Sequence, residues 1–500
     1  MKQETSVRQA LSRGALASSA AVTLVLIALS GGYGYHRDEL YFIIAGQHPA
    51  WGYPDQPSFT PMIAALMNLL APDSLMAQRI PAAIAAGLTV LLVALTTREL
   101  GGTRRAQTLA AIGTALSGMV LIPGHMLHTT TFDITFTAAV VWLLVKVIRG
   151  ADPRLLLVAG AVLGVALHNK YLIGGVVASL LLAIALTGPR TLFRSPWLYA
   201  GGAIAVLIWL PNLLWQFENG WPQLEMAKVL SEGNADRGGP LSFLAMQALV
   251  IGPLLIPLWL AGLIHLLRTP QLRFLGASYL ILTAALLAAG GSPLYLFGGY
   301  PALLAAGALP VDAWLSNGTT KLRTALVATT ATLSAIFIAP LALPLVPESY
   351  LDRIPVVQMN GLTAEQFGWP ELTNTVTKVY NGLPSTQRKN TVLIAENFGQ
   401  AAALQRYGRT QGLPSVHSGY RGYAAWERPP ATARNAILVQ PAKYPDAPAW
   451  VKKACTTLRQ VAEIRNNLNI KNREHGGTIW LCEDTTKSWD ELWPEITHLN

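Results

Sequence analysis

The sequence predicts a multi-span α-helical membrane protein with a C-terminal extracytoplasmic α/β domain. Charged residues make up 13% of the 500 residues, against about 25% in soluble proteins, and the mean hydropathy is +0.36. Charge is concentrated after Pro347, because residues 348–500 hold 17 of the 37 Lys and Arg and 14 of the 27 Asp and Glu. We therefore expect a membrane domain over residues 1–347 and a soluble domain over residues 348–500.

Long apolar segments predict about 11 transmembrane helices, because roughly 17–25 apolar residues cross about 30 Å of hydrocarbon. The predicted spans are residues 14–32, 79–97, 106–123, 131–148, 154–168, 171–188, 197–215, 242–266, 273–290, 294–311 and 324–345. The fifth span is short, and the tenth contains Pro301 and Pro310. The first lacks a small-residue cleavage site before Tyr33, so we expect it to be retained as a helix.

Lys and Arg in the short loops predict the orientation, since these residues stay on the cytoplasmic side. With the N-terminus inside, the cytoplasmic loops contain most of the basic residues. The outer loops contain only Arg37, Arg79, Lys170, Lys228 and Arg237. This predicts a protein of the cytoplasmic membrane with residues 348–500 outside the cytoplasm. The net charge of +10 then follows from topology and gives no reason to expect nucleic acid as a partner.

Most carboxylates of the predicted membrane domain fall at its outer face. They are Asp38, Glu39, Asp55, Asp73, Asp133, Glu218, Glu225, Glu232 and Asp236. Charge beside a membrane span is costly and usually faces a cavity or a substrate path. We therefore expect the functional site at this face.

The first outer loop, residues 33–71, is too long and too regular in sequence pattern for a simple connector. Asp38 and Glu39 precede the apolar run LYFIIAG, which predicts a short interfacial helix with an acidic start. The aromatic turn around Trp51 and Tyr53 presents Asp55-Gln56-Pro57, and residues 58–71 predict a second interfacial helix. A simpler alternative stays open at this point, in which Asp38 is a helix cap and Asp55 a solvated turn residue.

Two patterns in this loop carry a family resemblance. H-R-D-E-L-Y-F followed by W-G-Y-x-D-Q-P resembles the first periplasmic loop of the GT-C membrane glycosyltransferases. Within that class, the branch of the protein O-mannosyltransferases and aminoarabinosyltransferases, which is glycosyltransferase family 39-like, is the most similar. The resemblance continues through HTTTFDITF (128–136), LHNKYLIGG (167–175), LPNLLWQ (210–216) and GGSPLYLFGGYP (290–301), and so covers most of residues 1–310.

The resemblance implies an inverting glycosyltransferase that moves a sugar from a polyprenyl-phosphate donor to an envelope glycan, lipid or protein. A lipid-linked donor agrees with the predicted topology, because nucleotide sugars are absent outside the cytoplasm. The alternative is a transporter or flippase of lipid-linked sugars, for which we would expect inverted repeats and broken helices. No Walker, dinucleotide, H-E-x-x-H or C-x-x-C motif is present, so the sequence gives no support to those chemistries.

The resemblance also implies roles for single residues. Asp38 matches the family's catalytic base, with Glu39 beside it to orient Asp38 or the acceptor. Asp133 would be a further catalytic carboxylate, and its alternative is an acid that caps the start of the fourth span.

A second set of residues is expected to bind the donor. Relatives often have Lys where this chain has Gln56, and Lys170 is the obvious replacement cation for the donor phosphate, unless it only reaches from the interface to water. Arg37 is a weaker candidate, and Tyr295 and Tyr300 are expected to line a groove for the lipid phosphate.

A divalent metal ion is left open. Asp55 matches a position that can serve in metal or donor binding, and His125 with His128 is spaced i, i+3. Such a pair alone is weak evidence, because histidines at a membrane interface more often form hydrogen bonds.

The C-terminal domain shows short apolar strands at 391–396, 436–440 and 478–483 and helices at 370–382, 399–408 and 487–496. Cys455 and Cys482 are the only cysteines, and both fall in the domain predicted to be exported. An oxidising compartment predicts a disulfide between them.

Overall fold

The computed structural model describes residues 9–235, 239–317 and 319–499, and it divides into two compact units. The helical unit comprises residues up to Ser30, residues 56–60 and residues 76–343. The α/β unit comprises residues 31–55, 61–75 and 344–500. Most of the first outer loop therefore groups with the C-terminal domain.

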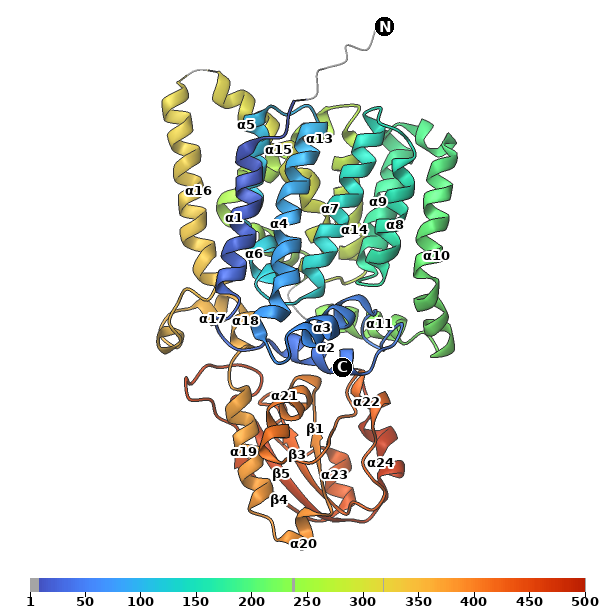
Figure 1. Ribbon diagram of the computed structural model, residues 1–500, viewed down its shortest axis with the longest axis vertical. Coiled ribbons are helices and arrows are strands. Elements are labelled where there is room, and N and C mark those ends of the chain that lie inside the picture. The colour runs from blue at the N-terminus through green and yellow to red at the C-terminus, as the bar shows by residue number, and fades with distance from the viewer. Residues whose placement is uncertain (1–8, 236–238, 318, 500) are drawn as a thin grey trace. The chain divides into compact units, whose positions relative to one another are not determined.

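The helical unit is built from helices, most of which run side by side (Figure 1). They are α1 (Arg13–Leu29), α4 (Leu75–Glu99), α5 (Arg104–Ala115), α6 (Gly118–Gly124), α7 (Thr129–Ile148), α8 (Leu155–Leu167), α9 (Leu172–Thr187), α10 (Pro196–Glu218), α11 (Pro222–Ala235), α12 (Gly239–Ile251), α13 (Ile256–Arg268), α14 (Arg273–Ala288), α15 (Tyr300–Ser316) and α16 (Thr320–Ala342). Short 3-10 helices are η1 (Arg190–Arg194), η2 (Pro253–Leu255) and η3 (Pro293–Gly299).

The multi-span membrane fold is confirmed, although the number of spans is not. Within the described residues, 5 helices are long and apolar enough to cross a membrane, or up to 7 if each of two bent helix pairs is one span. Helices α1, α8, α9 and α14 are apolar but shorter. Each of the eleven predicted segments contains helix, so about 11 spans stays a prediction.

Two of the predicted spans are bent. Residues 106–123 form α5 and α6 with a 51° bend, and residues 242–266 belong to α12 and α13, which meet at 92°. Gly252 between the latter pair has φ +120°, a conformation that only glycine adopts easily, and Pro253 cannot continue the α12 hydrogen bonds. The polar helix α11 was not predicted at all.

Glycines allow close helix packing inside the helical unit. A Cβ atom on Gly262 of α13 would lie 2.0 Å from the carbonyl oxygen of Leu303, and one on Gly307 of α15 would lie 2.0 Å from that of Leu258. Small residues at such contacts let backbones approach where lipid gives no hydrophobic drive. The close α13–α15 contact therefore fixes the position of α15 and of η3, which directly precedes it.

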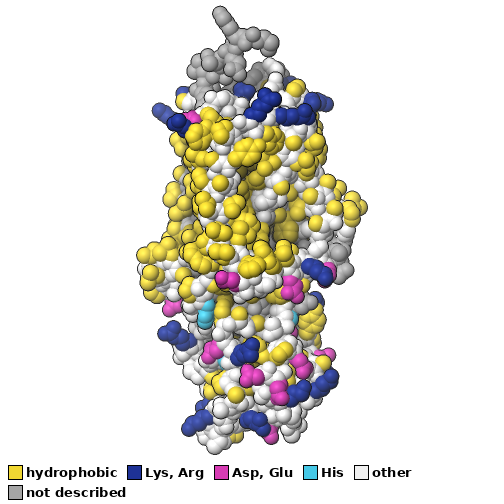
Figure 2. Space-filling view, turned by 90° about the vertical axis from the view of Figure 1, so that its right-hand side faces the viewer, with side chains coloured by type: hydrophobic (Ala, Val, Ile, Leu, Met, Phe, Trp, Pro, Cys, Tyr) yellow, Lys and Arg dark blue, Asp and Glu magenta, His cyan; other side chains and the backbone are white. Residues whose placement is uncertain are grey.

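The surface of the helical unit is that of a membrane protein. Figure 2 shows a broad hydrophobic band over it, with Lys and Arg gathered beyond one end of the band. Arg13, Arg104 and Arg273 each begin a helix, at α1, α5 and α14. The cytoplasmic orientation of this end stays a prediction.

A five-stranded mixed sheet forms the centre of the α/β unit, in the order β2-β1-β3-β5-β4. Its strands are β1 (Thr391–Ala395), β2 (Val416–His417), β3 (Asn435–Gln440), β4 (Cys455–Glu463) and β5 (Thr478–Thr485). Strands β1, β2 and β3 are parallel, and β5 runs antiparallel to β3 and β4. The sequence predicted β1, β3 and β5 but neither the two-residue β2 nor β4, whose side chains are mostly exposed and polar.

The helices of the α/β unit include the three predicted ones, α19, α21 and α24. The full set is α2 (Arg37–Gln47), most of α3 (Phe59–Leu70), α17 (Val356–Met359), α18 (Gly361–Ala364), α19 (Trp369–Asn381), α20 (Ser385–Arg388), α21 (Phe398–Gly408), α22 (Tyr423–Trp426), α23 (Ala449–Ala454) and α24 (Trp489–Ile496), with η4 (Glu348–Tyr350) and η5 (Arg409–Gln411). Cys455 and Cys482 form a disulfide between β4 and β5, with their Cα atoms 5.5 Å apart. Helix α2 of the first outer loop packs on α21.

Candidate active site

Helix α2 sets the positions of the two adjacent carboxylates of the first outer loop. His36 is its N-cap, and the imidazole Nδ1 accepts a hydrogen bond from the backbone N–H of Asp38 at 3.2 Å. Glu39 completes a capping box, because its Oε2 accepts from the N–H of His36 at 2.8 Å. Glu39 is fully buried, and its carboxylate holds the start of the helix.

Asp38 differs from its neighbour in exposure. The interpretation of Asp38 as the helix cap is wrong, since His36 takes that place. The Asp38 side chain is 23% exposed, and its oxygens lie 3.5 Å from Nε of Arg37 and 3.9 Å from Nδ1 of His36. It is thus a partly accessible carboxylate on a rigid first turn.

Asp55 belongs to the same unit and is buried. Its Oδ1 accepts a hydrogen bond from the Tyr41 hydroxyl at 2.8 Å, and its Oδ2 lies 3.7 Å from Nη1 of Arg421. Burial raises the pKa of Asp55, while Arg421 and the Tyr41 hydrogen bond act in the opposite direction and Asp38 adds to the rise. The alternative of a solvated turn residue is therefore wrong for Asp55.

Arg421 is a functional candidate that the sequence did not single out. Its backbone has φ +54°, which is uncommon for a side-chain-bearing residue and costs about 1–3 kcal/mol. Its guanidinium lies 4.9 Å from the ring centroids of both Phe398 and Tyr420. Burial alone would lower the pKa of Arg421, but Asp55, Tyr420, Tyr41 and Asp38 outweigh it and raise the pKa. The only signal was the adjacent Gly422 in the run GYRGY.

Glu365 is a second residue that the sequence did not indicate. It pairs with Arg37 at 2.8 Å, with Arg473 at 2.7 Å and with His36 at 3.4 Å. Burial would raise its pKa, but the hydrogen bond from His36 and the charges of both arginines lower the pKa to about 2. Arg37, which the sequence predicted to help bind the donor, thus already forms an ion pair with Glu365.

The helical unit contains a separate carboxylate, Asp133 of α7. His128 is the N-cap of α7, and its Nδ1 accepts from the N–H of Thr130 at 3.1 Å. Asp133 lies a turn further on, is 2% exposed, and its Oδ1 has no hydrogen-bond partner among the described residues. The interpretation as a helix-capping acid is therefore wrong, and a buried carboxylate oxygen without a partner is expensive unless something else fills that place.

Lys170 supplies the positive charge that acts on Asp133. It lies between α8 and α9, with Nζ 3.3 Å from the hydroxyl of Thr130 and 5.3 Å from the ring centroid of Tyr295. The ammonium group thus contacts α7 through Thr130 and η3 through Tyr295, all within the helical unit. This position differs from that of a lysine that reaches from the interface to water.

Residues 56–60 pack on the segment that carries Lys170. The Ser58 hydroxyl lies 3.2 Å from Nδ1 of His168, and the Thr60 hydroxyl donates to Oδ1 of Asn169 at 2.8 Å. Gln56 is buried, and its Nε2 has no hydrogen-bond partner among the described residues. An amide N–H₂ in this state is a donor that a bound ligand could satisfy.

Tyr295 and Tyr300 have different surroundings, and only Tyr295 contacts Lys170. Tyr300 is fully buried, donates to Oε1 of Gln247 at 2.9 Å and receives a bond from Tyr279 at 3.2 Å. The prediction that Tyr300 lines a groove is therefore corrected: its hydroxyl belongs to the core, where a buried tyrosine needs partners.

The positions proposed for a metal do not fit one. Both oxygens of Asp55 already have partners, one of them a guanidinium, and Nε2 of His125 lies 3.4 Å from Nη1 of Arg79. A second cation beside either arginine would be repelled. Among the residues that the structure describes, no group of three or more His, Cys, Asp or Glu side chains could hold a metal ion.

Comparisons with known proteins give one family-model match and several similar structures. Residues 55–215 match the family model of the dolichyl-phosphate-mannose-protein mannosyltransferases. No curated protein sequence matches the chain. The structure is similar to ArnT from Cupriavidus metallidurans in the apo state, with a TM-score of 0.56 and 14% identity over 94% of this chain and 97% of that chain. ArnT bound to undecaprenyl phosphate gives a TM-score of 0.57 at 14% identity, over 94% and 98% of the two chains.

A third similar structure is the arabinofuranosyltransferase AftD from Mycobacteria, with a TM-score of 0.52 and 16% identity over 95% of this chain and 42% of that chain. The predicted resemblance to the GT-C membrane glycosyltransferases is thus confirmed. The stretch matched by the family model includes two of the sequence motifs that predicted it in full, those with Asp133 and Lys170.

Proposed function

We propose that the chain is an inverting glycosyltransferase that moves a hexose or pentose from a polyprenyl-phosphate donor to an acceptor at the outer face of the cytoplasmic membrane. The observation that carries this proposal is Asp38, a partly exposed carboxylate fixed on the first turn of α2, in a chain with the GT-C fold. The similar ArnT binds undecaprenyl phosphate, which supports a lipid-phosphate donor here.

Asp38 acts as the general base in this proposal. An acceptor hydroxyl oxygen attacks the anomeric carbon from the face opposite the phosphate, and its proton passes to Asp38. The bond between the anomeric carbon and the phosphate oxygen breaks, and polyprenyl phosphate leaves as an anion. Attack from the opposite face inverts the anomeric configuration, and no general acid is needed for such a leaving group.

Cations are needed where the leaving phosphate gains charge. Lys170 is the candidate in the helical unit and Arg421 the candidate in the α/β unit. Asp133 balances the charge of the half-buried Lys170, while its own Oδ1, which has no partner among the described residues, is available to a donor hydroxyl. The roles of Lys170 and Arg421 are assigned separately, and each can be tested by itself.

The test uses purified protein, a polyprenyl-phosphate sugar and an envelope acceptor fraction. We expect acceptor-dependent release of polyprenyl phosphate and a product with the opposite anomeric configuration by NMR. Lys170→Ala should raise the KM for the donor and lower turnover, whereas Lys146→Ala, at the other end of α7, should change neither. A product that retains the donor's configuration would refute the inverting mechanism.

A transporter of lipid-linked sugars is the second candidate, because the bends at α5–α6 and α12–α13 are features that transporters use. The residues around the α12–α13 bend are apolar, among them Leu255 and Ile338. Transporters instead place polar or charged groups at their broken helices. The transferase therefore remains the better supported function.

A further inference from the structure

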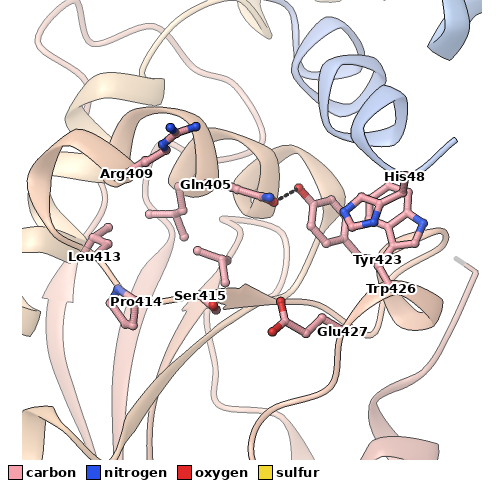
Figure 3. Close-up of a pocket in the computed structure, with 11 residues that line it drawn as sticks. His48, Gln405, Arg409, Leu413, Pro414, Ser415, Tyr423, Trp426 and Glu427 are labelled. Atoms are coloured by element: carbon pink, nitrogen blue, oxygen red, sulfur yellow. Dashed lines mark hydrogen bonds between the residues drawn. The ribbon is translucent and has the colours of Figure 1, made fainter. Parts of the chain in front are cut away.

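A cavity of about 240 Å³ lies in the α/β unit, apart from the carboxylates described above. Its lining includes His48 from the first outer loop, Gln405 and Arg409 from α21 and η5, Ser415 before β2, and Trp426 and Glu427 at the end of α22. Figure 3 shows these side chains around the cavity. The volume is smaller than the about 300–1,000 Å³ of pockets for drug-sized ligands, so it suits one small ring.

One end of the cavity is a fixed aromatic wall. The rings of His48 and Trp426 are stacked, with centroids 4.6 Å apart and planes at 7° (Figure 3). Trp426 is also stacked on Tyr41, at 5.8 Å and 25°. Burial lowers the pKa of His48, and the charge of Glu427, which raises it, has the smaller effect. The wall is therefore a stack of rings whose imidazole member favours the neutral form.

The rest of the lining is polar. Gln405 accepts a hydrogen bond from the Tyr423 hydroxyl at 3.1 Å through Oε1, which leaves its amide N–H₂ group as a donor. Glu427 supplies acceptors, Arg409 supplies donors, and Ser415 supplies a hydroxyl, and these three side chains are exposed. A flat aromatic wall facing several donors and acceptors suits a ring that is apolar on its face and polar at its rim.

A sugar ring has this chemistry. Its C–H groups pack on an aromatic face, while its hydroxyls exchange hydrogen bonds with amide, carboxylate and guanidinium groups. An acyl or polyprenyl chain would leave Glu427 and Arg409 beside hydrocarbon, which is costly. A nucleotide would exceed the volume.

We propose that this cavity binds one sugar ring of the acceptor, an inference that rests on the proposed glycosyltransferase function. Tyr41 supports the acceptor assignment, because its ring packs on Trp426 and its hydroxyl bonds to Asp55. Within the α/β unit, the ring of Tyr41 thus lies between the aromatic wall of the cavity and Asp55. A glycan acceptor extends over more than one ring, so it can occupy the cavity while its reacting hydroxyl lies elsewhere.

The direct test measures binding of methyl glycosides of neutral hexoses and pentoses to the full-length protein in nanodiscs, by saturation-transfer NMR. Ser415→Trp should fill the cavity from an exposed position and remove the signals of the bound glycosides. Ser385→Trp is the matched control, since Ser385 is exposed on α20 and does not line the cavity. Signals that persist in Ser415→Trp, or that are absent in the wild type, would overturn the proposal.

A kinetic test separates acceptor from donor. In the transfer assay, Ser415→Trp should raise the KM for the acceptor at least about tenfold, which corresponds to about 1.4 kcal/mol, and leave the donor KM unchanged. A raised donor KM with an unchanged acceptor KM would assign the cavity to the donor sugar and overturn the acceptor assignment. Glycoside binding in a protein that shows no transfer would instead refute the proposed function and leave a sugar-binding cavity.

Discussion

Asp38 and Glu39 are neighbours in sequence with different environments. Glu39 is buried in the capping box of α2, whereas Asp38 is partly exposed beside Arg37. If Asp38 is the base, Asp38→Asn should lower turnover about 10²–10⁴-fold, since the amide cannot accept the acceptor proton. Transfer from a purified polyprenyl-phosphate sugar measures this effect.

Glu39→Gln is the matched control, because glutamine also closes a capping box. It should fold and retain activity within a few-fold of wild type. Near-wild-type turnover of a well-folded Asp38→Asn protein would remove Asp38 from the mechanism, and a much larger loss in Glu39→Gln would move the base to Glu39.

Gly422 determines how closely Tyr41 approaches its neighbours. A Cβ atom at Gly422 would lie 2.5 Å from the Tyr41 hydroxyl, which donates to Asp55. Gly422→Ala should displace this hydrogen bond and lower turnover about tenfold or more, since leaving a buried partner unsatisfied costs about 1–3 kcal/mol. Gly361→Ala, where an added Cβ meets nothing within 4 Å, should leave turnover unchanged. Equal activity of the two variants would contradict a role for the Tyr41–Asp55 pair.

The site residues that could be predicted from the sequence were those that lie within a sequence motif. Asp38, Asp133 and Lys170 stood in recognisable patterns, so their positions near polar partners could be expected. Arg421 and Glu365 lie far along the chain from the loop that they contact, and each is a single charge in an unremarkable segment. Only the fold brings Arg421 to Asp55 and Glu365 to Arg37.

The start of α2 is tied to the segment after α18 by Glu365. Because its folded-state pKa is about 2, below the usual 4.5, Glu365 stabilises the α/β unit above about pH 4.5. This contribution, on the order of 3 kcal/mol, should disappear as the pH falls toward 2. The urea midpoint for proteolysis of the α/β unit in the full-length protein should therefore drop between pH 5 and pH 2.

Glu365→Gln should lower the midpoint at pH 7 and flatten its dependence on pH. Glu495→Gln removes an exposed pair with Lys487 and should change stability by less than about 0.5 kcal/mol. The same steep acid transition in Glu365→Gln as in wild type would show that another group is responsible.

Apolar runs predicted the helices and buried strands because hydrophobic periodicity reports burial directly. The apolar pattern could not predict the bend at Gly252, since a straight helix and a bent pair of helices can have the same run of apolar residues. Strand β4 was missed for the opposite reason: its mostly polar side chains face water at the sheet edge, so its alternation carries little hydrophobic signal. The outer loop was expected to belong to the membrane domain, yet most of it groups with the α/β unit.

The whole molecule has its chemistry assigned to one side of the membrane. If Lys and Arg mark the cytoplasmic side, alkaline phosphatase fused after Asn500 should be active, and a green fluorescent protein that folds only in the cytoplasm should stay dark at the same position. A fusion after Lys321, in a predicted cytoplasmic loop, should give the reverse pattern. Cytoplasmic fluorescence from the fusion after Asn500 would contradict the orientation and the outward-facing transferase.

The most direct test of the account follows a labelled polyprenyl-phosphate sugar in proteoliposomes that contain only this protein. A transferase must break the bond between the sugar and the phosphate, whereas a flippase moves the intact lipid. We predict that label passes from lipid to acceptor when the acceptor fraction is added, and that Asp38→Asn proteoliposomes leave it on the lipid. Label that crosses the bilayer still attached to polyprenyl phosphate, without transfer to any acceptor, would contradict the account.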